Sequence, residues 1–407
     1  MLPIPWSRPE PFGAWVRLDD ATLLAVDGPL AARLGVPHGG ALGGATRPLE
    51  LHLAVTARCP APCTGCYLDA RPDGVEPPFE EIVSRLAAAR AAGVSTVAFG
   101  GGEPLTRRDL GRLAAEARRL GLVPVMTTSG LGLTAARVAE LSAFAQINVS
   151  HDGVGGGYEA VRGFDGAAHA ERAIALLAAA GVPVGVNLVL TRGSLARLAP
   201  TAARVAELGA GELQLLRYKP AGRADDPGYA DRRLSPAEVD ALWPAIERLV
   251  AQRRLRVRID CAMVPLLSEA LLAAVPEPAR TLAALGVFGC EAARHLGALT
   301  VHGEAAACSF FTHARSDTLV PLSAAVPSRP PEPRALATIW DRSEGLDALR
   351  AYHAAPPEPC RSCALLPVCR GGCQIVSRRE RGAFAPDPEC PRVRAHAVAS
   401  GAPAGAS

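Results

Sequence analysis

Three cysteines lie close together early in the chain, at Cys59, Cys63 and Cys66, with the spacing Cys-x3-Cys-x2-Cys. They directly follow residues 51–55, an apolar run of the kind that forms a strand. A structural zinc site normally has four ligands, often supplied as pairs, whereas three thiolates on one loop leave a metal position without a protein ligand. We therefore predict a metal cluster with one position open to a bound ligand. A zinc knuckle is the alternative.

A second set of cysteines occupies the last third of the chain. Its members are Cys290, Cys308, Cys360, Cys363, Cys369, Cys373 and Cys390, and Cys261 stands apart from both sets. Eleven cysteines are many for a chain in which nothing directs export to a compartment where disulfides persist. The sequence therefore favours metal or cluster ligation over disulfides, in two separate regions.

Gly101, Gly102, Glu103 and Pro104 follow a second strand-like run, residues 96–100. Glycines allow the backbone to approach a ligand closely, and a carboxylate balances an ammonium group. Because this loop and the first cysteine loop both follow strands, we expect them to converge on one face of a sheet. A solvated loop acid is the alternative for Glu103.

The elements that must position these loops alternate along the chain. Strands are predicted at 51–55, 96–100, 123–128, 147–150, 182–190 and 213–218, with amphipathic helices between them. This order predicts an α/β fold whose parallel sheet curls into a full or partial six-stranded (β/α) barrel, with its site at the carboxyl ends of the strands.

The remaining segments flank this barrel. We predict a small appendage at 1–48, made of a hairpin, a short helix and a Gly-rich linker, followed by the barrel at 49–235. Linking helices and a strand at 236–284 then lead out of the barrel. A cysteine-rich domain follows at 285–395, and a flexible tail at 396–407. The cysteine-rich domain is rich in loops, so we expect metal sites to order it.

The net charge of +3 and the lack of a dense basic block argue against a nucleic-acid partner. The first residues carry prolines and an acid where a signal peptide needs a basic start and an apolar run. No stretch reaches the ~18 apolar residues of a membrane span. We therefore expect no membrane association and a cytoplasmic location.

The cysteine triad and the Gly-Gly-Glu-Pro segment together resemble the radical S-adenosylmethionine (SAM) superfamily. In that family three cysteines bind a [4Fe–4S] cluster whose fourth iron binds SAM. The resemblance implies that residues 101–104 hold the amino group of SAM, and that Ser150, Asp152 and Arg162 lie near its ribose and carboxylate.

Three details depart from the family pattern. Tyr67 follows the third cysteine, whereas the family often has an aromatic residue just before it, where this chain has Gly65. We still predict that Tyr67 binds the cofactor. Thr128 and Ser129 replace the usual Thr-Asn pair. Asn187 is predicted either to face the barrel interior or to be a buried structural amide.

The second cysteine set, with Gly303, resembles the SPASM domain of radical SAM enzymes, which follows Cys-x9–15-Gly-x4-Cys, Cys-x2-Cys-x5-Cys-x3-Cys and a final Cys. A zinc ribbon is the alternative. The resemblance implies two auxiliary clusters, and therefore three [4Fe–4S] clusters in all. The distal auxiliary cluster would be held by Cys360, Cys363, Cys369 and Cys390. The nearer one would be held by Cys290, Cys308 and Cys373, and we expect its fourth position to be open rather than filled by Cys261.

The resemblance implies an enzyme that cleaves SAM reductively to a 5′-deoxyadenosyl radical, which abstracts hydrogen from a substrate. SPASM enzymes act mostly on peptides or proteins, so we predict a maturase that crosslinks or oxidises a ribosomally made precursor peptide. Flavodoxin or ferredoxin is the predicted reductant. A formylglycine-forming maturase is disfavoured because Ser309 follows Cys308 where its relatives carry Asp. The chain could instead be a small-molecule dehydrogenase or a non-enzymatic iron–sulfur or zinc scaffold.

Overall fold

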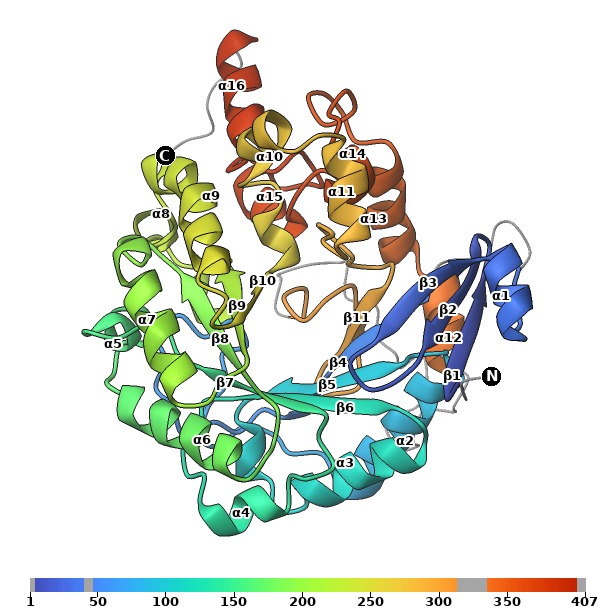
Figure 1. Cartoon of the computed structure of the whole chain (residues 1–407), viewed down its shortest axis with the longest axis vertical. Coiled ribbons are helices and arrows are strands. Elements are labelled where there is room, and N and C mark those ends of the chain that lie inside the picture. The colour runs from blue at the N-terminus through green and yellow to red at the C-terminus, as the bar shows by residue number, and fades with distance from the viewer. Residues whose placement is uncertain (1–3, 40–46, 313–334, 401–407) are drawn as a thin grey trace.

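The computed structural model describes residues 4–39, 47–312 and 335–400, and a curved nine-stranded sheet forms its centre (Figure 1). The six predicted barrel strands are present and pair in parallel in chain order. They are β4 (Glu50–Thr56), β5 (Thr96–Gly101), β6 (Val123–Thr128), β7 (Gln146–Ser150), β8 (Val184–Leu190) and β9 (Glu212–Arg217).

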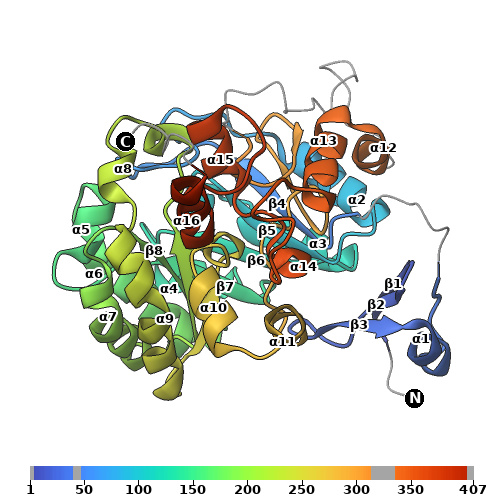
Figure 2. The same cartoon turned by 90° about the horizontal axis from the view of Figure 1, so that it is seen from above.

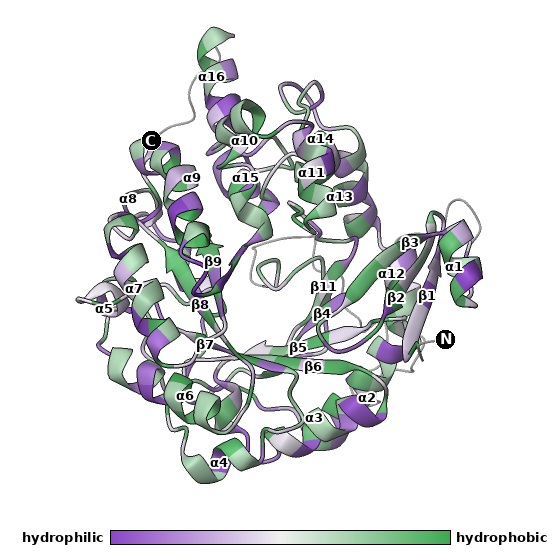
Figure 3. Cartoon of the chain, in the orientation of Figure 1, coloured by the Kyte–Doolittle hydropathy of each residue, from purple (hydrophilic) through white to green (hydrophobic). Residues whose placement is uncertain are grey.

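Helices cover the convex face of this sheet (Figure 1). They are α2 (Phe79–Ala91), α3 (Leu110–Arg119), α4 (Ala135–Ala139), α5 (Gly157–Arg162), α6 (Ala167–Ala179) and α7 (Leu195–Glu207). Alternate strand residues such as Leu51, Leu53 and Val55 are buried in the same core as Ile82 and Leu86 of α2. Figure 3 shows these helices apolar in part and polar in part, as expected for a layer between core and solvent.

Three further strands extend the sheet on both sides. The predicted linking strand is β10 (Arg256–Ile259), which does not leave the barrel but pairs in parallel with β9. At the other edge β11 (Leu296–Leu299) pairs in parallel with β4, and β12 (Ala305–Ala306) pairs antiparallel with β11. The cysteine-rich region therefore contributes strands to the barrel sheet.

Two further helices continue the outer layer. They are α9 (Pro236–Ala251), which packs beside α7, and α12 (Ala335–Arg342), which packs on α2. The short helix α8 (Tyr229–Arg232) precedes α9.

Most of the C-terminal elements lie toward the open side of the curved sheet (Figures 1 and 2). They are the 3₁₀ turn η3 (Cys261–Met263), α10 (Ser268–Ala274), α11 (Pro278–Ala284), α13 (Glu344–Ala354), α14 (Leu366–Cys369), α15 (Gln374–Arg381) and α16 (Pro391–Ala399). Helix α16 reaches into the segment 396–407 that was predicted to be a flexible tail. Residues 401–407 of that segment lie outside the described residues.

The N-terminal appendage is a separate antiparallel sheet of β1 (Trp6–Glu10), β2 (Gly13–Arg17) and β3 (Leu23–Asp27), followed by α1 (Gly28–Leu34). The predicted hairpin corresponds to β2 and β3, and β1 was not predicted. Pro9 is tolerated in β1 because β1 is an edge strand. Buried Arg8 and Arg17 join this sheet to the barrel through backbone carbonyls, including Gly93 at 3.0 Å and Gly121 at 3.1 Å.

Within the described ranges, no helix has the length and apolar character needed to cross a membrane.

Candidate functional site

Cys59, Cys63 and Cys66 lie on the loop that follows the carboxyl end of β4, and all three are half-buried. The backbone of Cys59 donates to the carbonyl of Arg71 at 2.9 Å, which folds the loop back on itself. Burial, together with the charges of the neighbouring Glu103, Cys63 and Cys66, raises the pKa of Cys59 to about 11. The three thiols are thus close enough to interact electrostatically.

Arg223 braces this loop from the 3₁₀ turn η2 (Gly222–Ala224), which follows β9. Its Nε donates to the carbonyl of Cys63 at 2.9 Å, and its backbone N–H donates to the carbonyl of Cys66 at 2.8 Å. Gly222 has φ 56°, and a Cβ there would come within 2.5 Å of the Cys66 carbonyl. Only glycine fits this contact without displacing the cysteine loop.

Glu103 lies against the same loop and is only 2% exposed. Its backbone N–H donates to the carbonyl of Arg58 at 2.7 Å, and a Cβ on Gly102 would lie 2.1 Å from that carbonyl oxygen. The carboxylate accepts hydrogen bonds from Thr128 Oγ1 at 2.6 Å and from the backbone N–H of Ser129 at 2.7 Å. Thr128 and Ser129, which depart from the family pattern, therefore orient the carboxylate.

Asp152 and Arg162 form an ion pair beyond the carboxyl end of β7, where Ser150 is the last strand residue. Asp152 accepts from Arg162 Nε at 2.5 Å and from the backbone N–H of Val189 at 2.8 Å. Burial alone would lower the pKa of Arg162, but Asp152 raises it, so the guanidinium stays charged. Arg162 Nη1 then donates to Cys63 Sγ at 3.7 Å. The pair thus directs a positive charge toward the cysteine triad.

Tyr67 turns from the triad toward the second cysteine region. Its ring lies 4.6 Å from that of Phe310, centroid to centroid, and Lys219 Nζ lies 4.2 Å from the Phe310 centroid. Lys219 is buried and forms an ion pair with Asp260. Tyr67 and Phe310 therefore connect the triad loop with the residues around Cys308.

The concave face of the sheet carries a ladder of side-chain amides. Asn148 of β7 donates to Asn187 Oδ1 of β8 at 2.8 Å, and Gln146 of β7 donates to Glu212 of β9 at 3.0 Å. Their strand neighbours Ile147 and Val149 are buried in the core, so the amides point away from the helices. Asn187 belongs to this interior ladder, in agreement with the first of the two predictions for it.

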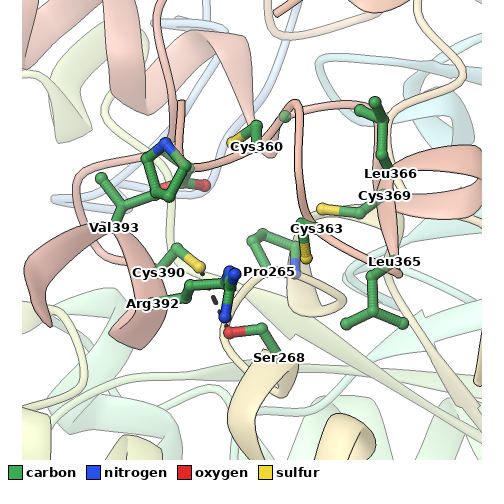
Figure 4. Close-up of a pocket in the computed structure, with 13 residues that line it drawn as sticks. Pro265, Ser268, Cys360, Cys363, Leu365, Leu366, Cys369, Cys390, Arg392 and Val393 are labelled. Atoms are coloured by element: carbon green, nitrogen blue, oxygen red, sulfur yellow. Dashed lines mark hydrogen bonds between the residues drawn. The ribbon is translucent and has the colours of Figure 1, made fainter. Parts of the chain in front are cut away.

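Four cysteines of the second set surround one pocket (Figure 4). They are Cys360, Cys363, Cys369 and Cys390. Ser268 Oγ lies 3.2 Å from Cys390 Sγ, which ties this pocket to α10. Burial raises the pKa of Cys360 to about 12, and the neighbouring Cys390 and Cys363 add to the rise. The structure thus brings together the four residues predicted for the distal cluster.

A second site brings together Cys290, Cys308 and Cys373. Cys290 and Cys373 belong to a small apolar cluster that also contains Ala262, and Cys308 packs against it. Burial raises the pKa of Cys308 to about 11, and Cys373 contributes to the rise. Burial also raises the pKa of Cys261, with Cys290 and Cys373 among the other causes. Cys261, at the start of η3, therefore lies beside the set predicted for the nearer cluster.

A buried ionic network holds this second region against β9. Arg217 contacts Asp387 at 2.6 Å and Glu389 at 2.8 Å, and it also donates to the carbonyl of Ala262 at 3.1 Å. Asp387 accepts from the backbone N–H of Cys373 at 2.9 Å. The barrel strand, η3 and the cysteine loops are thus fixed relative to one another.

Comparison with known proteins identifies the family. Residues 53–195 match the family model described as Radical SAM superfamily. A PqqA peptide cyclase of Streptomyces rochei is 30% identical over 354 residues, covering 84% of this chain and 89% of the relative. One from Methylobacterium sp. strain 4-46 is 30% identical over 369 residues, covering 86% and 88%. The chain belongs to the radical SAM superfamily of enzymes.

Two solved structures show the same fold. Streptococcus suis SuiB, bound to the precursor peptide SuiA, superposes with a TM-score of 0.71 at 17% identity, covering 95% of this chain and 98% of SuiB. The protein anSMEcpe with bound AdoMet has a TM-score of 0.63 at 16% identity, covering 87% and 98%. The predicted α/β fold with a parallel sheet and a SPASM-type cysteine-rich C-terminal region is confirmed.

Radical SAM enzymes bind SAM and a [4Fe–4S] cluster, and the donor set at the mouth of this barrel fits both. The three half-buried thiols of the triad, with the guanidinium of Arg162 beside them, suit a cluster. The buried carboxylate of Glu103, which lies within electrostatic reach of Cys59, suits an amino group. In the described part of the chain, no three His, Cys, Asp or Glu side chains are arranged to hold a single metal ion.

Sequence reasoning missed Arg223, Arg217 and the amide ladder. The ladder had a local signal, because polar Gln146 and Asn148 alternate with apolar residues in this strand of a predicted parallel sheet. The two arginines had none, since their partners are up to 170 positions away.

Proposed function

We propose that this radical SAM enzyme matures a ribosomally made precursor peptide or protein, by forming a crosslink or oxidising a side chain. The similarity to enzymes named PqqA peptide cyclase, which extends along 84% of this chain, carries the proposal. The amide ladder on the concave face supports it, because side-chain amides can both donate to and accept from a peptide backbone. SuiB, which shares the fold, was crystallised with a precursor peptide.

In this proposal Cys59, Cys63 and Cys66 hold the SAM-binding cluster, and residues 101–104, with Glu103 as the carboxylate, hold the amino group of SAM. The cofactor supplies a 5′-deoxyadenosyl radical that abstracts a hydrogen atom. Arg162, held by Asp152, stabilises negative charge beside Cys63. Ser150 and Tyr67 remain predicted SAM contacts, although the Tyr67 ring packs on Phe310.

The two further cysteine sets would hold two auxiliary [4Fe–4S] clusters, which makes three in all. Cys360, Cys363, Cys369 and Cys390 supply four ligands to the distal one. Cys290, Cys308 and Cys373 supply three to the nearer one, and the position of Cys261 makes it the available fourth ligand. This proposal differs from the open site expected from the sequence, and the Cys261→Ala variant distinguishes the two. A flavodoxin or ferredoxin would supply electrons, and the cytoplasm remains the predicted location.

The test uses the reconstituted enzyme, SAM, dithionite and synthetic peptides encoded by short reading frames beside its gene. We expect 5′-deoxyadenosine together with a peptide that has lost two hydrogen atoms in mass. The variant in which Cys59, Cys63 and Cys66 are all alanine should give neither product. Formation of 5′-deoxyadenosine with oxidation of a small molecule, and with no peptide modified, would favour a small-molecule dehydrogenase instead.

A further inference from the structure

Strand β10 presents two arginines on the concave face of the sheet. Its apolar residues Val257 and Ile259 pack against the core. Arg256 and Arg258 alternate with them along the strand and therefore face the opposite side. Their side chains are 64% and 58% exposed, and β10 is an edge strand at the open side of the curved sheet (Figure 1). A ligand on the concave face can thus reach both guanidinium groups.

A buried carboxylate holds these two side chains in place. Glu212 of β9 is buried, and its carboxylate lies 2.7 Å from Arg256 Nε and 3.6 Å from Arg258 Nη1. The same carboxylate accepts a hydrogen bond from Gln146 of the amide ladder at 3.0 Å. Burying a carboxylate is costly unless it is paired, so these contacts are held together and orient both guanidinium groups. Less side-chain freedom then remains to be lost when a ligand binds.

The two guanidinium groups share this one carboxylate. Among the residues that the structure describes, no other carboxylate forms an ion pair with either arginine. Glu50 of β4 interacts with Arg258 over a longer distance, but Glu50 is hydrogen-bonded to His52 at 2.9 Å. A guanidinium group carries five N–H donors in a planar fork that matches a carboxylate. The exposed parts of Arg256 and Arg258 are therefore suited to bind an acidic group.

Arg258 also lies at the end of a row of side chains that leads to the cofactor site. In the register of the sheet, Arg258 pairs with Gln214, and Gln214 pairs with Asn187 of the amide ladder. Asn187 in turn pairs with Ser150, a predicted SAM contact. The strand spacing of ~4.8 Å places Arg258 about 14 Å from Ser150, a distance that about four residues of extended peptide span.

We propose that Arg256 and Arg258 bind an acidic side chain of the precursor peptide, about four residues from the residue that reacts. This inference rests on the proposed function and names a chemical feature of its substrate. An acidic reductant is the other partner whose charge would fit. The concave position favours the peptide, because the arginines adjoin side-chain amides that suit a peptide backbone.

The experiment measures peptide binding to the reconstituted holoenzyme by fluorescence anisotropy. The probes are two labelled synthetic peptides, one of alternating Glu and Gly and one of alternating Gln and Gly. The variants are Arg256→Gln and Arg258→Gln, which remove the charge but keep a hydrogen-bond donor. Arg248→Gln is the control, because Arg248 is an exposed arginine on α9, in the outer layer.

We expect the wild type and Arg248→Gln to bind the Glu peptide at least about 10-fold more tightly than the Gln peptide, because hydrogen bonds between charged groups are the stronger ones. Arg256→Gln and Arg258→Gln should each lose about 10-fold in affinity for the Glu peptide and keep their affinity for the Gln peptide. Added salt should reduce the preference of the wild type, since both arginines are exposed. A purely structural role would weaken binding of both peptides alike.

A second measurement uses a peptide that the enzyme modifies, with dithionite as the reductant. Each acidic residue of the peptide is replaced in turn by its amide. Loss of the acid about four residues from the reacting residue should raise KM about 10-fold with little change in kcat, because this contact is the same in the ground state and the transition state. Acids at other positions should have little effect on KM.

Equal affinity of the wild type for the two probes, or no loss of affinity in the two arginine variants, overturns the inference and leaves the proposed function intact. If the wild type prefers the Glu peptide but modifies no peptide, the proposed function fails, whereas the acid-binding role of the two arginines is retained. Unchanged peptide affinity with slower reduction by flavodoxin in the variants would assign the arginines to the reductant, which also overturns the inference.

Discussion

The thiols of Cys59 and Cys63 resist deprotonation in the absence of metal. Burial raises the pKa of Cys59 to about 11 and also raises the pKa of Cys63, where Arg162 opposes the effect. Arg162 supplies one positive charge beside Cys63, and bound iron would supply the rest, because only the deprotonated thiol binds metal. Deprotonation of these thiols should therefore depend on binding of the cluster. The triad should not share ligands with the second cysteine region.

Replacing Cys59, Cys63 and Cys66 together with alanine should remove one cluster and all SAM cleavage. Iron should fall from about twelve to about eight atoms per chain if three [4Fe–4S] clusters are present. Iron analysis and detection of 5′-deoxyadenosine check this. Complete loss of iron, or continued SAM cleavage, would contradict the assignment.

Cys261→Ala should leave the nearer cluster with three cysteine ligands. Because a free iron position makes a cubane prone to losing that iron, mild oxidation of this variant should give a three-iron signal in electron paramagnetic resonance. The measurement is made with the triad removed, so that only auxiliary clusters contribute. Met263→Leu, a buried neighbour in the same turn, is the packing control. Identical spectra for Cys261→Ala and the control would restore the open site expected from the sequence.

For single residues, the cysteines were highly informative. The triad predicted from spacing and the two sets implied by the family resemblance are each gathered in one place. Residues close in the sequence, such as Asp152 and Arg162, could each be predicted as site residues, but the ion pair between them could not. Arg217 and Asp387 could not be paired from the sequence, because they are 170 positions apart. A contact of that span leaves no periodic or local signal.

Among the structural elements, η2 has the most direct effect on the triad. It projects Arg223 under the cysteine loop, where hydrogen bonds from the charged donor reach the carbonyls of Cys63 and Ala70 and the carboxylate of Asp69. Bonds of this kind are each worth about 1.5–3 kcal/mol.

Arg223→Ala should loosen this loop and lower occupancy of the SAM-binding cluster, with the two auxiliary clusters retained. Iron content and the change in the reduced-cluster spectrum on adding SAM report the effect. Arg71→Ala is the matched control, because Arg71 also contacts Asp69 but its side chain is 65% exposed. Equal behaviour of the two variants would show that Arg223 does not position the triad.

The periodicity of the sequence located all six barrel strands, because each alternates or runs apolar between helices. It did not assign β10 and β11 to the same sheet. β11 is only four residues long, and its partner β4 is selected by tertiary packing rather than by any property of the segment itself.

Across the whole molecule, the network of Arg217, Asp387 and Glu389 joins the barrel to the cluster-bearing loops. Arg217 is 3% exposed, and burial would lower its pKa, but the two carboxylates raise it well above its usual value. Removing one member of a buried network leaves the others charged and unpaired, which typically costs about 3–5 kcal/mol.

Arg217→Met should therefore lower the stability of the chain by about that amount, measured as the midpoint of denaturant unfolding. Arg280→Ala is the control, since Arg280 and its partner Glu277 are 83% and 70% exposed. An exposed ion pair contributes ~0–1 kcal/mol to stability, so this control should leave the unfolding midpoint almost unchanged. Similar midpoints for the two variants would mean that the network does not join the two regions.

The pairing of β4 with β11 also affects how the chain emerges from the ribosome. β4 can pair with β5 soon after both are synthesised, but β11, which pairs with the other edge of β4, is synthesised about 250 residues later. At 5–20 residues per second this takes about 12–50 s, during which β4 offers unpaired backbone groups to neighbouring chains. Expression yield should therefore respond to translation speed and chaperone supply more than the stability of the finished enzyme would suggest.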